Sequence, residues 1–351
     1  NAFINVSGVY QGYNRYDYFI ESEDTELTGA TKETGWVWRP GFTAKFGGNY
    51  LLSEWSNVFM NVGHLNRTPV SQNVIGFDNQ VVDNIENEKV NSIELGYSFS
   101  KYPFSFNANT YYTQWNNRPL NSLLRVETPE GNIVRANINA MSALHRGVEF
   151  DGAWKINQTM ALEGFVSVGD WVWTSREDSL MLVDDITNLP YVDPNTGNPM
   201  TIQYDAKGVS VGDSPQSQYG AAFKYAHKSG FYVKPRYTYF HRHFGDFDPF
   251  SLYGDDSGRQ SWEIPGYGLL DLHTGYSFDL KESQIDVRLS IFNVLNKVYI
   301  INAQNNDALS EVFYRKPQET YPFSENNFDA SSASVYMGYG VRSNFSIRVR
   351  F

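Results

Sequence analysis

Residues 334–351 read SVYMGYGVRSNFSIRVRF. The odd positions from Val335 to Phe351 are apolar apart from Ser343, and the even positions from Ser334 to Arg350 are mostly small, polar or basic. Because side chains alternate between the two faces of a strand, this stretch predicts a β-strand with one apolar face and one wet, basic face. A strand crosses a bilayer in roughly 9–11 tilted residues, so this one is long enough to span a membrane. We interpret it as the strand that seals a transmembrane β-barrel, because a soluble protein with such an exposed edge would be prone to aggregate.

The composition agrees with a barrel that has a polar lumen. Mean hydropathy is −0.45, and no stretch approaches the roughly 18 apolar residues of a membrane helix. Barrel strands escape hydropathy detection because every second residue faces the lumen. Aromatic residues make up 16% of the chain, with 24 Tyr, 24 Phe and 8 Trp. Outer-membrane barrels carry such residues in girdles at both membrane interfaces.

Charge and cysteine content exclude several classes of protein. The net charge of −11 argues against nucleic acid as a partner, because phosphate binding needs a basic surface. The chain has no cysteine, which excludes disulfide scaffolds and cysteine-based zinc sites. No signal peptide precedes the first strand pattern, so we expect a processed or partial product.

Strand patterns recur along the whole chain, and we count about twelve of them. They cover residues 2–18, 36–50, 55–66, 88–100, 103–117, 145–156, 160–174, 216–225, 231–244, 267–280, 284–297 and 334–351. The sequence therefore predicts an all-β fold, a transmembrane antiparallel β-barrel, with residues 1–351 as one domain.

The connections between these patterns alternate strictly between short and long. The short ones are residues 51–54, 100–103, 157–159, 226–230 and 281–283. The long ones are residues 19–35, 67–87, 118–144, 175–215, 245–266 and 298–333. Short turns at one end and long loops at the other are typical of bacterial outer-membrane barrels, so we expect that location.

Four stretches resemble one family. Residues 291–300, IFNVLNKVYI, resemble a signature near the C-terminus of TonB-dependent outer-membrane receptors, with Asn293, Asn296 and Tyr299 at the matching positions. The ending on Phe351 also fits this family. The stretches VGDSPQSQY, FGDFDPF and IPGYGLLDLHTGY are similar to receptors of Bacteroidetes-type bacteria, and they cover residues 211–219, 244–250 and 264–276.

The resemblance implies a barrel of about 22 strands. In this family an N-terminal plug fills the lumen, and the import of a scarce nutrient is driven by the TonB complex through the plug. We therefore expect residues 1–351 to be the C-terminal half of such a barrel, with the plug domain and TonB box absent from this chain. The expected partners are outer-membrane lipid, the N-terminal half of the barrel with its plug, the TonB complex and a surface lipoprotein. A siderophore, cobalamin, a glycan or a peptide would be the ligand, and no cofactor is expected.

We expect ligand contacts in the long loops, mainly 175–215 and 298–333, and in the upper lumen. The candidates are Tyr239, His241, His243, Phe313, Tyr314 and Tyr321. The two histidines stand two apart on one predicted strand face, and Asp246 or Asp248 would have to complete any metal site. Loop-base histidines without a metal are the favoured interpretation.

Three further expectations concern single positions. Trp171 and Trp173 suit an aromatic belt at the membrane interface. Asp279 should face Asp286 across a tight turn, a repulsive pair that needs a cation between the carboxylates. Arg348 or Arg350 on the last strand are candidates for that cation.

No enzyme is expected, because the chain has no G-x-S-x-G elbow, H-E-x-x-H pair or glycine-rich phosphate loop. Two alternatives to a receptor stay open. A passive porin would need these strands to close around an open lumen, and an outer-membrane enzyme would need a Ser/His or paired-carboxylate site at its rim.

We expect that the chain does not close into a barrel alone. The first strand, in residues 3–11, has no feature that marks it as terminal. An open edge in a bilayer would leave unpaired backbone groups at several kcal/mol each, so a partner must cover it. The backbone of residues 2–14 should then not be hydrogen-bonded to that of residues 334–351.

The alternation in the last strand predicts that Val341, Phe345, Ile347 and Val349 face lipid. Ile347→Arg should destabilise the folded protein by roughly 2–4 kcal/mol near the bilayer midplane. Reversible unfolding from lipid vesicles measures this, with Ser346→Arg on the opposite face as the control. Equal stability of the two variants would contradict the predicted orientation.

Overall fold

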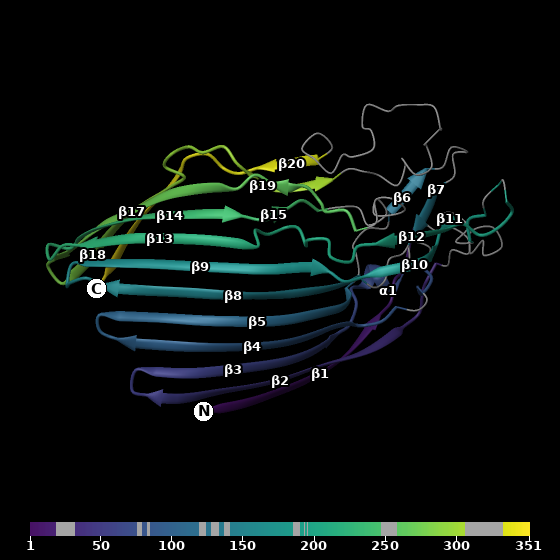
Figure 1. Ribbon diagram of the computed structural model, residues 1–351, viewed down its shortest axis with the longest axis horizontal. Coiled ribbons are helices and arrows are strands. Elements are labelled where there is room, and N and C mark those ends of the chain that lie inside the picture. Colours follow the sequence, from purple (N-terminus) through teal and green to yellow (C-terminus); the bar gives the residue numbers. More distant parts are fainter. Residues whose placement is uncertain are drawn as a thin grey trace.

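The computed structural model describes residues 1–18, 32–75, 79–82, 85–118, 124–127, 133–136, 141–184, 190–192, 194, 196–246, 258–305 and 333–351. Twelve long strands form one antiparallel sheet, in which neighbours along the chain are neighbours in space (Figure 1). In sheet order they are β1 (Ala2–Tyr13), β2 (Val37–Ser53), β3 (Ser56–Arg67), β4 (Glu88–Lys101), β5 (Phe104–Arg118), β8 (Met141–Lys155), β9 (Met160–Trp173), β13 (Ser217–Ala226), β14 (Phe231–His241), β17 (Tyr267–Leu280), β18 (Ser283–Phe292) and β21 (Arg342–Arg350).

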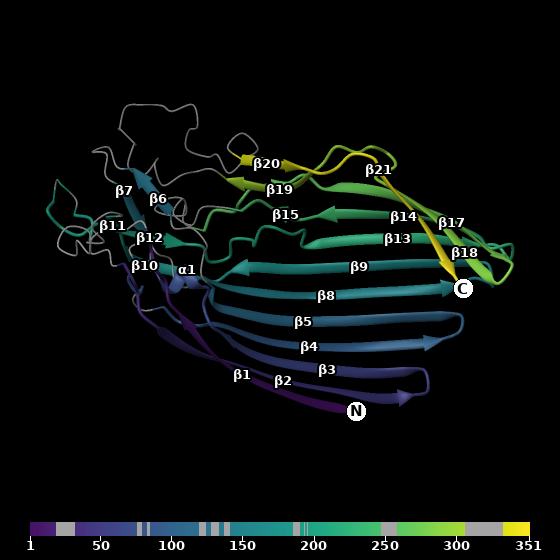
Figure 2. The same cartoon turned by 180° about the vertical axis from the view of Figure 1, so that it is seen from behind.

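Short strands and one helical turn lie in the long connections. These are α1 (Ser71–Val74), β6 (Leu124–Glu127), β7 (Ile133–Ala136), β10 (Arg176–Met181), β11 (Val183–Asp184), β12 (Thr201–Asp205), β15 (His243–Phe244), β16 (Glu263–Ile264), β19 (Ile300–Asn305) and β20 (Ala333–Met337). Figures 1 and 2 show them gathered at one end of the sheet, which we call the loop end, while the short turns lie at the other. No helix in the described part of the chain is long and apolar enough to cross a membrane.

The strand register aligns the apolar side chains into one continuous surface. Residues directly opposite each other on paired strands point to the same face. One such row crosses eight strands through Val58, Tyr97, Ala108, Phe150, Val166, Tyr219, Tyr239 and Gly268. A second row joins Phe231, Tyr276, Val287 and Ile347 on the last four strands. We call this surface the apolar face and the opposite one the polar face.

The apolar face is covered by no other element of the described structure. Phe345 and Ile347 are 62% and 59% exposed, and Ile4 and Val6 on the first strand are 76% and 73% exposed. A soluble protein rarely leaves so large a contiguous apolar surface in water. Lipid is the environment that this face fits, as the alternation in residues 341–349 predicts.

The sheet is open at both edges. Among the described residues β1 pairs with β2 alone and β21 pairs with β18 alone. The expectation that residues 2–14 are not hydrogen-bonded to residues 334–351 is therefore confirmed. In Figure 2, β1 lies at the lower edge of the sheet, and β21 runs from the upper part of the view down to the C-terminus without reaching β1.

The interpretation of residues 334–351 as one strand is wrong. The structure divides them into β20, which pairs with β19, and β21, which pairs with β18. The break at residues 338–341 is held by the signature residues. Asn293 has a φ of 51° and donates from Nδ2 to the carbonyl of Lys297 at 2.9 Å and to that of Tyr339 at 3.1 Å. Asn296 accepts from the backbone N–H of Val341 at 3.2 Å through its Oδ1.

A glycine permits this break. A Cβ added to Gly338 would lie 2.1 Å from the Cζ of Tyr299, far inside van der Waals contact, so only glycine lets the backbone pass the ring. The N–H of Gly338 donates to the carbonyl of Tyr299 at 2.8 Å. Asn293, Asn296 and Tyr299 thus end β18, start the β19–β20 hairpin and hold the returning chain. Their described contacts are structural.

Asn293→Gly tests this role, because glycine keeps the positive φ without strain and removes only the side-chain hydrogen bonds. Asn293 is 3% exposed, so Tyr339 and Lys297 would lose buried partners. We expect a loss of about 1–3 kcal/mol in unfolding free energy. Asn344→Gly, on the exposed polar face of β21, is the matched control for strand glycine. A loss no larger than that of the control would contradict the role.

Candidate ligand-binding site at the loop end

The polar face is a wall of mutually paired polar side chains. Glu94 accepts from Asn61 at 3.0 Å and from Asn109 at 2.7 Å. Further along the sheet Lys234 pairs with Glu163 at 2.5 Å, and the guanidinium of Arg236 lies 2.9 Å from a carboxylate oxygen of Asp271. Because these charges neutralise one another, this part of the wall is a poor source of a strong ligand site.

The expected facing of Asp279 and Asp286 is wrong. The β17–β18 turn places Asp279 opposite Gln284 and Asp286 opposite Ser277. The hydroxyl of Ser277 donates to Asp286 at 2.6 Å, and Nη2 of Arg350 lies 3.1 Å from the other carboxylate oxygen. Arg350 is therefore the cation expected from the last strand, but it pairs with Asp286 alone and does not lie between two carboxylates.

An aromatic row lines the polar face near the loop end. Trp115 on β5, His145 on β8 and Trp171 on β9 lie next to one another. His145 stacks on Trp171 with ring centroids 5.2 Å apart, and its ring is tilted by 44° against that of Trp115 at 6.1 Å. Nε1 of Trp171 donates to the hydroxyl of Tyr111 at 2.8 Å. The guanidinium of Arg118 lies 5.9 Å from the ring of Trp115. Stacked rings beside a cation form a surface that suits planar or conjugated polar ligands.

The interface-belt interpretation of Trp171 and Trp173 is wrong. In register Trp171 lies opposite His145 and Trp173 opposite Ala143, on the polar face. Val172 between them points to the apolar face. The alternation along β9 could have revealed this. Val166 and Val168 place the even-numbered residues of β9 on the apolar face, so the odd-numbered Trp171 and Trp173 lie on the polar face.

The stretch at residues 211–219 holds this row in place. Gln216 is 1% exposed, and its Oε1 accepts from the backbone N–H of Trp171 at 3.0 Å. Its Nε2 donates to the carbonyl of Trp171 at 2.9 Å. The N–H of Val211 donates to the same carbonyl at 2.9 Å. The chain between β12 and β13 thus replaces the strand partner that β9 lacks at its end.

A carboxyl pair lies next to this segment. Asp213 and Asp246 come from the stretches at residues 211–219 and 244–250, and their carboxyl groups lie close enough to interact. Burial and the neighbouring Asp213 raise the pKa of Asp246 to about 7, so the pair shares a proton at lower pH. Asn302 on β19 donates to Asp213 at 3.1 Å. The pair ties the β9–β13 connection to the β14–β17 and β18–β21 connections.

The structure separates the predicted histidines. β14 ends at His241, and Arg242 follows with a φ of 53°, so His243 begins a different strand. His241 stacks on Tyr239 at the apolar face and lies 3.8 Å from Glu263. His243 is 2% exposed and lies near Asp213, and its burial lowers its pKa. No group of three or more metal-binding side chains occurs among the described residues.

Three of the other predicted contacts belong to the last long loop. Phe313, Tyr314 and Tyr321 lie outside the described residues. Tyr299, a signature residue and not one of the predicted contacts, packs with its ring tilted against Tyr267 on the polar face, with ring centroids 4.4 Å apart. Contact of Tyr239, His241 or His243 with a ligand stays a prediction. The described rings and charges that converge at the polar face come instead from Trp115, His145, Trp171, Asp213 and Asp246.

The comparisons with known proteins agree with this architecture. The family described as TonB dependent receptor-like, beta-barrel matches residues 10–294. The chain belongs to this family, and so it is a protein of the bacterial outer membrane. The family consists of transport receptors. No curated protein matches the chain.

Three solved structures share the fold at low identity. Ferric citrate transporter FecA in its unliganded form has a TM-score of 0.54 at 13% identity, over 90% of this chain and 38% of that one. Copper transporter OprC has a TM-score of 0.52 at 11% identity, over 90% and 40%. The ferric yersiniabactin uptake receptor FyuA from Yersinia pestis has a TM-score of 0.50 at 14% identity, over 90% and 37%. The chain therefore spans well under half the length of these structures.

The family sets the orientation of the sheet. Outer-membrane barrels have short periplasmic turns and long extracellular loops, so the loop end is extracellular. The aromatic row and the carboxyl pair accordingly lie on the side from which a ligand would arrive. β1 begins and β21 ends at the periplasmic end (Figure 1).

The carboxyl pair predicts a pH dependence. The pKa of Asp246 is about 7 in the folded protein and 3.8 as the reference value of the unfolded chain. Because the folded protein binds this proton more tightly, protonation of Asp246 stabilises the fold. The stabilisation is fully present below the unfolded pKa, and it is lost as the pH rises through the folded pKa. We expect the amide protection factors of residues 211–216 to fall between pH 5 and pH 8, by roughly one to two orders of magnitude.

Asp246→Asn should remove most of this fall, because the amide keeps a hydrogen bond without a titrating proton. Asp279→Asn at the periplasmic end is the control and should change nothing at residues 211–216. Hydrogen exchange read by mass spectrometry gives the protection factors. An unchanged pH dependence in Asp246→Asn would assign it to another group.

Proposed function

We propose that the chain is the C-terminal half of the barrel of an outer-membrane receptor that imports a scarce nutrient with TonB-coupled energy. One observation carries the proposal: the twelve-stranded sheet presents a lipid-compatible face and yet leaves β1 and β21 unpaired among the described residues. Unpaired backbone groups in hydrocarbon cost several kcal/mol each, so further strands must complete the barrel. Family membership and the spanned share of the solved receptors support a partner half with about ten further strands.

In this proposal a plug domain fills the lumen, packs on the polar wall and receives energy from the TonB complex. The ligand meets the aromatic row at Trp115, His145 and Trp171 and the long loops 175–215 and 298–333. The similar structures are transporters or receptors of ferric citrate, copper and ferric yersiniabactin. Stacked rings, Arg118 and the carboxyl pair favour a polar chelate or conjugated ligand over an apolar one. A surface lipoprotein would cover the loop end.

Cross-linking tests the open sheet. The chain has no cysteine, so introduced cysteines are the only thiols in residues 1–351. Val287→Cys with Ile347→Cys are register partners on β18 and β21 and should cross-link with a short bifunctional reagent in intact membranes. Val6→Cys with Ile347→Cys, on the two edge strands, should not. Efficient cross-linking of the edge pair would support a self-closed barrel and the porin alternative.

Uptake tests the transport mechanism. Cells that express the protein at its native length should accumulate a labelled ferric siderophore, cobalamin, glycan or peptide only while the membrane is energised. A protonophore or loss of TonB should abolish this accumulation. Uptake that survives both treatments, together with ion conductance of the purified protein in planar bilayers, would favour a passive porin. Hydrolysis of lipid or peptide without uptake would favour the enzyme alternative.

A further inference from the structure

The apolar face carries a charged cluster that the proposed transport function does not explain. Arg146 on β8 and Asp170 on β9 are register partners, and both point to the lipid side of the sheet. Nε and Nη2 of Arg146 donate to one carboxylate oxygen of Asp170 at 2.9 Å and 2.7 Å. Nη2 of Arg242, in the residue after β14, lies 3.8 Å from the other oxygen. Every other apolar-face residue of β8 and β9 is uncharged.

The cluster carries an excess of positive charge. Two guanidinium groups share one carboxylate, which leaves a net charge of +1. Nη1 of Arg242 donates to the carbonyl of Gly169 at 2.7 Å, which fixes the side chain beside Asp170. Nη1 of Arg146 has no hydrogen-bond partner in the described structure, and the side chain is 57% exposed. An arginine with free donors in a fixed fork is suited to bind a phosphate group.

The depth of the cluster matches a lipid headgroup. Arg146 precedes Lys155, at the periplasmic end of β8, by nine positions. At about 3.3 Å per residue and a tilt of about 40°, this separation corresponds to roughly 23 Å along the membrane normal. The apolar band of such barrels is about 25 Å tall, so the cluster lies at the outer boundary of the hydrocarbon. Tyr112, the register partner of Arg146 on β5, is 47% exposed on the apolar face, as an aromatic side chain at a membrane interface would be.

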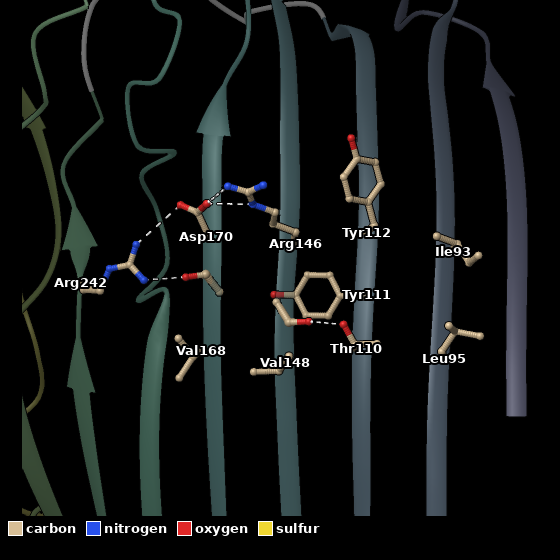
Figure 3. A pocket seen from close by; sticks show the side chains of 12 residues that line it. Ile93, Leu95, Thr110, Tyr111, Tyr112, Arg146, Val148, Val168, Asp170 and Arg242 are labelled. Carbon is tan, nitrogen blue, oxygen red and sulfur yellow. Dashed lines mark hydrogen bonds and ion pairs between the residues drawn. The ribbon is translucent and has the colours of Figure 1, made fainter. Parts of the chain in front are cut away.

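An apolar groove leads from the cluster into the membrane. Its upper part, about 600 Å³, lies among Ile93, Leu95, Thr110, Val148 and Val168 below the two arginines. Its lower part, about 610 Å³, shares Leu95, Thr110 and Val148 and continues past Ala108. Figure 3 shows Arg242, Asp170 and Arg146 across one level, with Val168, Val148 and Thr110 on the membrane side of them.

The groove exists because β5 carries small side chains where its neighbours carry large ones. On the apolar face Ala108 and Thr110 lie between Leu95 and Tyr97 on β4 and Val148 and Phe150 on β8. The hydroxyl of Thr110 donates to the carbonyl of Gly147 at 3.1 Å, so it offers its methyl group to the groove. A channel with apolar walls and a satisfied backbone fits an acyl chain.

We propose that Arg146 and Arg242 bind the headgroup of a phosphate-bearing lipid of the outer leaflet, whose acyl chain occupies the groove over Thr110 and Ala108. The cationic top and apolar stem of the site match the anionic head and apolar tail of such a lipid. Asp170 positions both arginines and sets the net charge. The site depends on the membrane location and not on the transported ligand.

Native mass spectrometry tests the site on the protein at its native length, purified from outer membranes in a mild detergent. Phosphatidylglycerol should bind, and diacylglycerol with the same chains should bind about ten-fold more weakly because it lacks the phosphate. Inorganic phosphate alone should also bind about ten-fold more weakly, because it cannot use the groove. Equal binding of phosphatidylglycerol and diacylglycerol, or of phosphatidylglycerol and phosphate, would overturn the proposal.

Variants separate a binding role from a structural one. Arg146→Gln should weaken phosphatidylglycerol binding about ten-fold, while Arg348→Gln on the polar face should leave it unchanged. Asp170→Asn should tighten it, because both arginines lose their competing carboxylate. Thr110→Phe should weaken binding of the lipid and leave binding of phosphate unchanged. Unaltered binding in Arg146→Gln, weaker binding in Asp170→Asn, or a lipid-independent dimer through this face would each overturn the site.

Discussion

Backbone hydrogen bonding inside the hydrocarbon is the constraint on which the rest of this structure depends. No water reaches the N–H and C=O groups there, so each strand must be bonded along its whole length to a neighbour. Sequential antiparallel pairing meets this demand for ten of the twelve long strands on both sides. It also leaves β1 and β21 with one bonded side each among the described residues. This pairing pattern is what supports the proposed further strands.

The same constraint explains the form of the last connection. β18 must end where the membrane ends, because a chain that leaves the sheet inside the bilayer would leave its backbone N–H and C=O groups without hydrogen-bond partners. Asn293 satisfies this point locally: its N–H donates to Asp271 at 3.0 Å and its side chain bonds both arms of the connection. The returning chain passes Tyr299 at Gly338 and re-enters the sheet as β21. The family signature therefore joins the membrane sheet to the extracellular hairpin.

Charged side chains are distributed differently on the two faces of the sheet, because one face contacts lipid and the other the aqueous lumen. On the polar face, carboxylates such as Glu163 and Asp271 pair with cations of neighbouring strands, which lowers the field inside the lumen. On the apolar face, charge occurs along β8 and β9 only at the height of Arg146 and Asp170. Near an interface an arginine costs roughly 0–1 kcal/mol, against about 2–4 at the midplane. Depth therefore decides where a charge on this face is tolerated.

Much of the fold could be read from the sequence, because alternation with period two is local. The rows that include Val148 and Phe150, or Ile285 and Val287, assign each strand its faces without any knowledge of its neighbours. The alternation of short and long connections likewise predicted antiparallel order and the two ends of the sheet. The open edge was also predictable, because nothing in residues 3–11 marks a terminal strand.

Pairing between distant segments was decided only by the tertiary structure. Residues 334–351 keep one alternating pattern, and the pattern cannot show that contacts with Asn293 and Tyr299 break the strand in its middle. Asp213 and Asp246 are 33 positions apart, and nothing local indicates that their carboxyl groups lie together. The row of Trp115, His145 and Trp171 likewise needs the register of three strands. Alternation is set by the backbone of a single strand, whereas a site is set by which strands the chain places side by side.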